Sequence, residues 1–159
     1  MIFVTGDMHG DYKIFKQPIY KNIKKSDTLV ICGDFGFIWT GDKNEKSVLD
    51  KLAKKNYTIC FVDGTHENFD LLAKYPVVEF CGGLAHKIRE NIYHLMRGQI
   101  FEIEGEKIFA MGGGESPDID IRFENNTWSK AEIPNSDEMK DGIRNLEAEK
   151  FEVDFIVTH

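Results

Sequence analysis

Carboxylate and imidazole side chains recur in glycine-flanked turns and at strand ends along this chain of 159 residues. Asp7 and His9 lie in "GDMHGD", Asp34 lies in "ICGDFG", His66 lies in "DGTHEN", and His159 ends "FIVTH". A mixed set of carboxylates and imidazoles suits borderline divalent metals such as Mn²⁺, Fe²⁺, Zn²⁺ and Co²⁺, whereas an all-oxygen set would suit Mg²⁺ or Ca²⁺ better. The residue types therefore indicate metal binding.

None of these segments indicates a metal site by itself. Asp is common in turns because of its local hydrogen bonding, and a solitary histidine is more often a surface or core residue than a ligand. The indication comes from repetition, since an apolar run precedes each of the four segments.

Short apolar runs at residues 2–5, 28–32, 57–62 and 77–80 predict strands, and the spacing of apolar residues predicts helices over 12–25 and 44–56. Pro18 is expected to make the first helix irregular. Alternating strands and helices favour parallel pairing through right-handed crossovers. In such sheets ligands collect outside the carboxyl ends of the strands, so the candidate ligands are expected to converge.

The second half of the chain has a different pattern. Residues 86–114 contain segments in which apolar and polar residues alternate, with turn signals between them, which predicts an antiparallel meander. Residues 115–137 are acidic and irregular. A helix is expected over 136–151, with Ser136 as its cap, and a last strand over 153–158. The sequence predicts one α/β domain over residues 1–159.

Composition restricts the possible partners. With 42% apolar residues the chain can bury a core, and a net charge of −7 argues against nucleic acid or an anionic membrane as the partner. There is no apolar run of about 18 residues and no basic leader, which favours a cytoplasmic protein. The three cysteines lie far apart in apolar surroundings and are expected to be buried, reduced thiols.

Taken in order, "GDMHG", "GDFG", "GTHE" and "VTH" resemble the signature of the calcineurin-like metallophosphoesterases, over the whole chain. The resemblance implies a four-layer α-β-β-α sandwich with two mixed sheets. It also implies two divalent metal ions and hydrolysis of a phosphomonoester or phosphodiester by attack of a metal-bound hydroxide. The expected partner is a small phosphoester or nucleotide, and the oligomeric state is left open.

The resemblance also assigns metal ligands. It implies that Asp7 and His9 bind the first metal ion, that Asp34 bridges both ions, and that His159 binds the second. A bridging role suits a carboxylate, because two metal ions in such sites lie about 3.5–4 Å apart.

The "GTHE" segment carries the implied catalytic group. His66 would contact the phosphate and help the leaving group depart, with Glu67 as its acidic neighbour. Thr65 stands where the family pattern has an Asn ligand of the second metal. A hydroxyl is a shorter and weaker donor than an amide carbonyl, so Thr65 could weaken that site, recruit water or close it differently.

The family's final Gly-His-x-His segment is absent after His159, so the sequence is interpreted as truncated at its C-terminus. We expect partial metal occupancy and impaired activity. The alternative is a non-catalytic binding or scaffolding protein that retains the fold. The protein phosphatase branch of the resembled family has an Asp-Arg-Gly after its second motif, and because this sequence has "GDFGFIWTG" there, a protein phosphatase is disfavoured.

Several other polar residues are given lesser roles. Arg89 and Arg97 are candidate phosphate contacts, because a guanidinium suits phosphate oxygens. His86 and His94 have no partner pattern and are not expected in the site. Residues 111–116, "MGGGES", are interpreted as a turn after a strand, and the acidic stretch around Arg122 as a solvated face.

Overall fold

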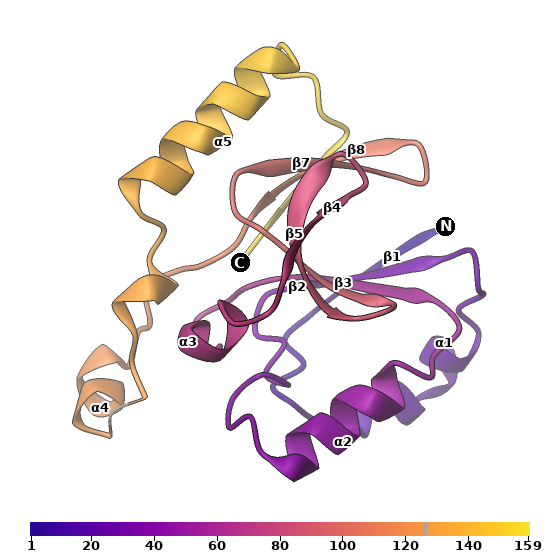
Figure 1. The fold of residues 1–159 in the computed structure, drawn as a ribbon, viewed down its shortest axis with the longest axis vertical. Coiled ribbons are helices and arrows are strands. Elements are labelled where there is room, and N and C mark those ends of the chain that lie inside the picture. The colour runs from indigo at the N-terminus through magenta and orange to yellow at the C-terminus, as the bar shows by residue number, and fades with distance from the viewer. Residues whose placement is uncertain (126) are drawn as a thin grey trace.

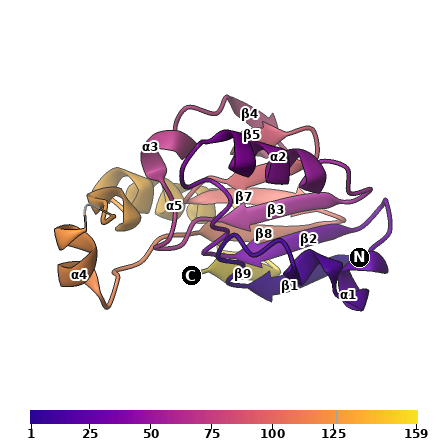
Figure 2. The same ribbon diagram turned by 90° about the horizontal axis from the view of Figure 1, so that it is seen from below.

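The computed structural model describes residues 1–125 and 127–159. In this part of the chain two β-sheets pack face to face, with helices on the outer sides (Figure 1). In the view from below, the strands of the two sheets overlap, and α1 (Pro18–Lys21) and α2 (Lys43–Leu52) lie on the side of the viewer (Figure 2). The expected four-layer α-β-β-α arrangement with two mixed sheets is confirmed.

The first sheet has six strands, in the order β1 (Ile2–Gly6), β2 (Thr28–Cys32), β3 (Thr58–Val62), β6 (Ile92–Leu95), β5 (Gly83–Arg89) and β4 (Val77–Phe80). The first four strands in this order are parallel, and β6, β5 and β4 pair antiparallel. The parallel pairing predicted from alternating strands and helices is therefore confirmed. It places the carboxyl ends of β1, β2 and β3 at one edge.

The second sheet contains β7 (Gln99–Ile103), β8 (Glu106–Met111) and β9 (Phe155–Thr158). β7 and β8 are antiparallel, whereas β8 and β9 are parallel. The single meander expected over 86–114 is wrong, because the chain changes sheets after β6. β6 already has β3 and β5 as neighbours, so neither side is open to β7.

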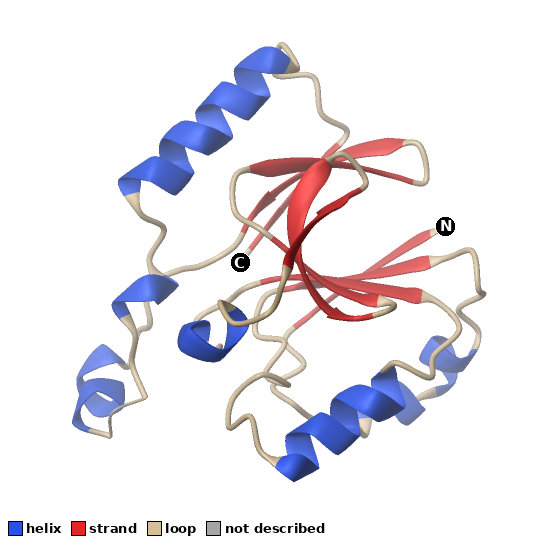
Figure 3. Ribbon diagram, viewed as in Figure 1, coloured by secondary structure: helices blue, strands red, loops and turns tan. Residues whose placement is uncertain are grey.

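Helices lie outside both sheets (Figure 3). They are η1 (Ile14–Lys16), α1 (Pro18–Lys21), α2 (Lys43–Leu52), α3 (Phe69–Leu72), α4 (Ile119–Glu124), η2 (Lys130–Glu132) and α5 (Ser136–Ala148). Pro18 follows an extended Gln17 and divides the first helical segment, as expected. The N-cap of α5 is Asn135 rather than Ser136, because the Asn135 side chain accepts from the backbone of Glu138, whose carboxylate accepts from Asn135 N–H.

Two apolar cores lie on opposite faces of the first sheet. Leu29 and Ile31 of β2 pack with the helices, whereas Val30 packs in the core between the sheets, with Phe101 of β7 and Val157 of β9. This alternation arises because successive side chains of a strand point to opposite faces of the sheet. A strand that is buried on both faces has an unbroken apolar sequence, which explains the run of apolar residues in β2.

The described helices are short. α5, the longest, has 13 residues, and none is both long and apolar enough to cross a membrane. Cys32, Cys60 and Cys81 are free thiols, as expected, but only Cys60 is buried, whereas Cys32 is half-buried and Cys81 is exposed. Burial raises the pKa of the Cys60 thiol, so it is not a reactive thiolate.

Candidate metal centre

The structure brings together the five candidate ligands at the carboxyl ends of β1, β2, β3 and β9. Asp34 lies at the centre with its side chain 5% exposed. Its Oδ2 lies 2.8 Å from His66 Nδ1 and 3.8 Å from His9 Nε2, and its Oδ1 lies 3.3 Å from His159 Nε2. The two carboxylate oxygens therefore face different imidazoles.

Two groups of possible ligand atoms share Asp34. One contains His9, Asp34 and His66, and the other contains Asp7, Asp34 and His159, with the atoms of each group within 4.8 Å of one another. Oxygen and imidazole nitrogen donors in groups of three suit borderline divalent metals. The donor set thus fits two metal ions that share one carboxylate.

The loops after β1 and β2 are joined by backbone hydrogen bonds. Met8 N–H and His9 N–H both donate to the carbonyl of Asp34, at 3.0 and 2.9 Å. Asp7, His9 and Asp34 have positive φ angles of 22°, 43° and 47°, which non-glycine residues adopt infrequently. Such backbone costs free energy and clusters at functional sites, where the surrounding structure holds it in place.

Two glycines lie so close to the candidate ligands that a side chain on either glycine would collide with them. A Cβ on Gly33 would lie 2.2 Å from the ring of His159, and one on Gly64 would lie 2.1 Å from Asp34 Oδ1. Gly33 also has a φ of 82°, which glycine adopts without strain. The glycines flanking the ligand motifs therefore let a side chain approach the backbone closely.

The environment keeps Asp34 ionised. Burial acts to raise the pKa of Asp34, but the hydrogen bonds from the backbone N–H and ring of His66, with the charges of His66 and His159, outweigh it and lower the pKa. The His66 N–H donates to Asp34 Oδ1 over 2.8 Å. A carboxylate that stays charged is the form that binds a cation.

The segment after β3 differs from expectation at Glu67. Glu67 Oε1 accepts hydrogen bonds from the N–H groups of Phe35 and Gly36, at 2.6 and 3.4 Å, and has no hydrogen bond to His66. The His66 ring instead bonds to Asp34 and lies 3.1 Å from Thr65 Oγ1. Glu67 therefore holds the loop after Asp34, and burial raises its pKa well above the usual value.

A family model described as calcineurin-like phosphoesterase matches residues 1–159, the whole chain. The chain belongs to the calcineurin-like phosphoesterases. No protein of curated function and no solved structure matches it significantly. Membership in this family indicates hydrolysis of phosphoesters with metal ions, and it does not specify the substrate.

In this calcineurin-like phosphoesterase the candidate ligand atoms that lie close together are not the same pairs as those assigned from the motifs. Asp7 and His9 were expected on the same metal ion, whereas the ligand atoms place Asp7 beside His159 and His9 beside His66. The His9 and His66 rings are 5.2 Å apart in a T-shaped arrangement. Asp34 is shared in both assignments, and the individual roles remain predictions.

Neither arginine proposed as a phosphate contact reaches this centre. Arg97 donates to Asp63 Oδ2 through Nε at 2.8 Å, in a pair that is almost fully buried, and Arg89 pairs with Asp50 at the surface. His94 Nε2 lies 2.9 Å from Asp63 Oδ1 and His94 Nδ1 lies 3.0 Å from His86 Nδ1. As expected, these two histidines lie outside the ligand groups, although no motif signalled their network.

The solvated face expected around Arg122 is wrong at Arg122 itself, which is 5% exposed. Arg122 pairs with the fully buried Glu132 at 2.9 Å and donates to the carbonyl of Thr65 at 2.8 Å. A buried guanidinium needs such partners because an unpaired one is costly. In the sequence, Trp128 in an acidic stretch was the available sign that this segment packs.

Proposed function

We propose that this chain hydrolyses a phosphomonoester or a phosphodiester with two divalent metal ions, Mn²⁺ among the candidates, held around Asp34. The observation that supports it is the position of Asp34. Its two oxygens face different imidazoles, and it belongs to both groups of candidate ligands. Together with the family membership, this favours a shared carboxylate between two ions.

Each residue has a distinct task in this proposal. Asp7, His9 and His159 hold the ions with Asp34, which remains ionised because its pKa is lowered. When bound, the ions supply positive charge to the phosphoryl oxygens and make water nucleophilic at neutral pH.

His66 handles the proton of the leaving group. Its side chain is 41% exposed, so a substrate can reach the ring, and the bond to Asp34 orients it. Giving a proton to the departing oxygen is worth roughly 10²- to 10⁴-fold in rate. Glu67 supports the geometry through Phe35 and Gly36, next to the shared carboxylate.

Hydrolysis of bis(p-nitrophenyl) phosphate and p-nitrophenyl phosphate tests this function. We expect p-nitrophenol release with added Mn²⁺, loss of release with a chelator, and a fall of at least about 10²-fold in Asp34→Asn, since a bridging ligand serves both ions. Metal content after dialysis, measured by mass spectrometry, should fall in the same variant.

Asp50→Asn is the matched control, because Asp50 is an exposed carboxylate whose partner is the half-buried Arg89, away from the Asp34 cluster. It should retain wild-type turnover. Metal bound by the wild-type chain without hydrolysis of either ester would instead support a non-catalytic binding role.

A further inference from the structure

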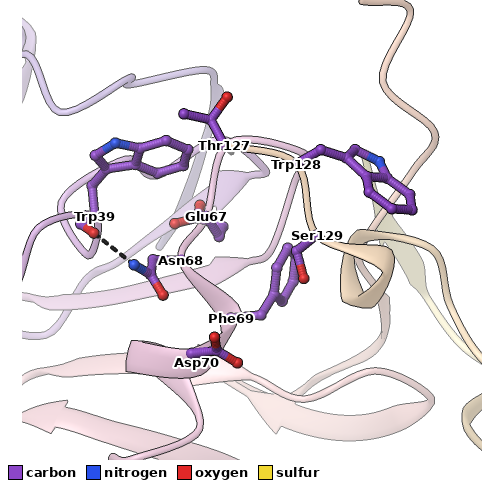
Figure 4. A pocket seen from close by; sticks show the side chains of 8 residues that line it. All are labelled: Trp39, Glu67, Asn68, Phe69, Asp70, Thr127, Trp128 and Ser129. Carbon is purple, nitrogen blue, oxygen red and sulfur yellow. Dashed lines mark hydrogen bonds between the residues drawn. The ribbon is translucent and has the colours of Figure 1, made fainter. Parts of the chain in front are cut away.

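A pocket of about 210 Å³ begins directly beside the loop that carries His66. Four consecutive residues of that loop and of α3, Glu67 to Asp70, line one part of it. Trp39 lies at one side, and residues 127–129 lie opposite (Figure 4). A ligand whose phosphate lay on the Asp34 cluster could therefore extend into this pocket.

The outer wall of the pocket is held by buried charge. One guanidinium nitrogen of Arg122 donates to the carbonyls of Thr65 and Thr127, at 2.8 and 2.9 Å. It thereby joins the loop that carries His66 to residues 127–129, which form the wall of the pocket. The other nitrogen pairs with Glu132, whose second oxygen accepts from the indole N–H of Trp128 at 3.0 Å. Because every part of this arrangement is hydrogen-bonded, the wall is a defined structure.

Trp39 presents an aromatic surface with a free edge. Its backbone is held by Glu45 and by the Asn68 side chain, at 2.8 Å each. Its indole N–H has no hydrogen bond to any described residue, in contrast to that of Trp128. In Figure 4 the Trp39 ring lies along the pocket while the Trp128 ring turns away.

Glu67 places a polar atom at the pocket. Oε1 is taken by Phe35 and Gly36, but Oε2 is buried and has no hydrogen-bond partner within residues 1–125 and 127–159. Glu67 is 3% exposed and lines the pocket. A buried polar atom without a partner lowers stability, so a ligand that reaches this atom and pairs with it gains affinity.

The residues that line the pocket indicate which chemical class of ligand it can bind. Trp39 and Phe69 suit a flat ring, but a plain hydrocarbon ring would leave Glu67 Oε2 unpaired. A heterocyclic base has a flat face together with adjacent donors and acceptors along its edge. The volume is below the roughly 300–1,000 Å³ of sites for drug-sized ligands, and so suits one ring system.

We infer that this pocket binds the base of a nucleotide, which would make nucleotides the substrate class of the metal centre. The inference rests on the proposed function, with the phosphate at the Asp34 cluster and the base between Trp39 and Phe69. Glu67 then connects the Asp34 cluster with the base pocket. One of its carboxylate oxygens holds the loop after Asp34, and the other pairs with the edge of the base.

Fluorescence of Trp39 tests the inference directly. Because the chain has two tryptophans, Trp128→Phe leaves Trp39 as the only one. In this background, adenosine, adenosine 5′-monophosphate, ribose 5-phosphate and inorganic phosphate are titrated with Mn²⁺ present. We expect quenching by the two ligands that carry a base, and binding of the monophosphate about 5- to 150-fold tighter than ribose 5-phosphate, the range for one stacked base.

Trp39→Ala and Trp39→Phe, compared by calorimetry in the otherwise wild-type chain, separate stacking from a general loss of structure. Alanine should remove the preference for the monophosphate over ribose 5-phosphate, while phenylalanine should keep most of it. Equal affinity of the two phosphates for the wild type, or a preference that survives Trp39→Ala, would overturn the inference.

The same titrations distinguish this inference from the proposed function. Quenching of Trp39 by adenosine without hydrolysis of any ester would support the base pocket and count against catalysis. Ester hydrolysis and phosphate binding without any effect of the base would support catalysis and overturn the base pocket.

Discussion

The carboxylate of Asp34 is buried and ionised at the same time, which requires compensation by its neighbours. Burial alone would raise its pKa, yet the N–H and ring of His66 and the charge of His159 lower it. The same contacts place His66 in one of the two candidate ligand groups. Whether His66 is a proton donor or a metal ligand is therefore a question that metal content can answer.

Replacing His66 by alanine should lower turnover by roughly 10²- to 10⁴-fold, because a positioned proton donor is lost. Metal content should stay near that of the wild type. Steady-state kinetics and mass spectrometry of the dialysed variant provide both measurements. His9→Ala is the comparison, since it should lose metal together with activity. If His66→Ala loses as much metal as His9→Ala, His66 is a ligand.

At the scale of elements, the short helices depend on local caps and on packing. The Asn68 side chain caps α3 by accepting from Leu71 N–H at 3.0 Å, directly after the loop that carries His66. α5 begins with a capping box between Asn135 and Glu138, and Glu138 also contacts Arg97 at 3.1 Å. The start of α5 is thereby connected to the buried network at the end of β3.

Replacing Asn135 by alanine should lower the free energy of unfolding by about 1 kcal/mol, within a range of roughly 0.5–2 kcal/mol, because the N–H groups of Asp137 and Glu138 lose their acceptor. Urea denaturation followed by circular dichroism measures this. Ser136→Ala, one residue later, should have little effect, since its side chain has no hydrogen bond to any described residue. A larger effect at Ser136 would contradict this cap.

Across the whole molecule, a chain of polar contacts connects three strands of the first sheet to α5. His86 of β5 contacts His94 of β6, His94 contacts Asp63 at the end of β3, and Asp63 pairs with Arg97. Burial and the neighbouring charge of His94 lower the pKa of His86 to about 4, against the partial opposing effect of Asp63. His86 is therefore neutral in the folded protein at mildly acid pH.

This network predicts how stability depends on pH. An unfolded histidine has a pKa near 6.5, so between about pH 6.5 and pH 4 the unfolded chain binds the proton that folded His86 does not. The free energy of unfolding should fall as pH falls through this window, and His86→Gln should fall less. Urea denaturation of both proteins from pH 7 to 4 measures the difference, and a constant difference across that range would contradict the prediction.

The sequence by itself determined the candidate ligands, the parallel strands and the family, because these follow from local patterns: apolar periodicity, turn residues and the order of four short motifs. Glu67, Arg122 and the change of sheet after β6 were decided by tertiary structure. The bond from Phe35 to Glu67 joins residues 32 positions apart, and that from Arg122 to Thr65 joins residues 57 apart. Motif spacing contains no information about such partners, since they meet only when the sheets, residues 115–125 and 127–135, and the loop that carries His66 pack together.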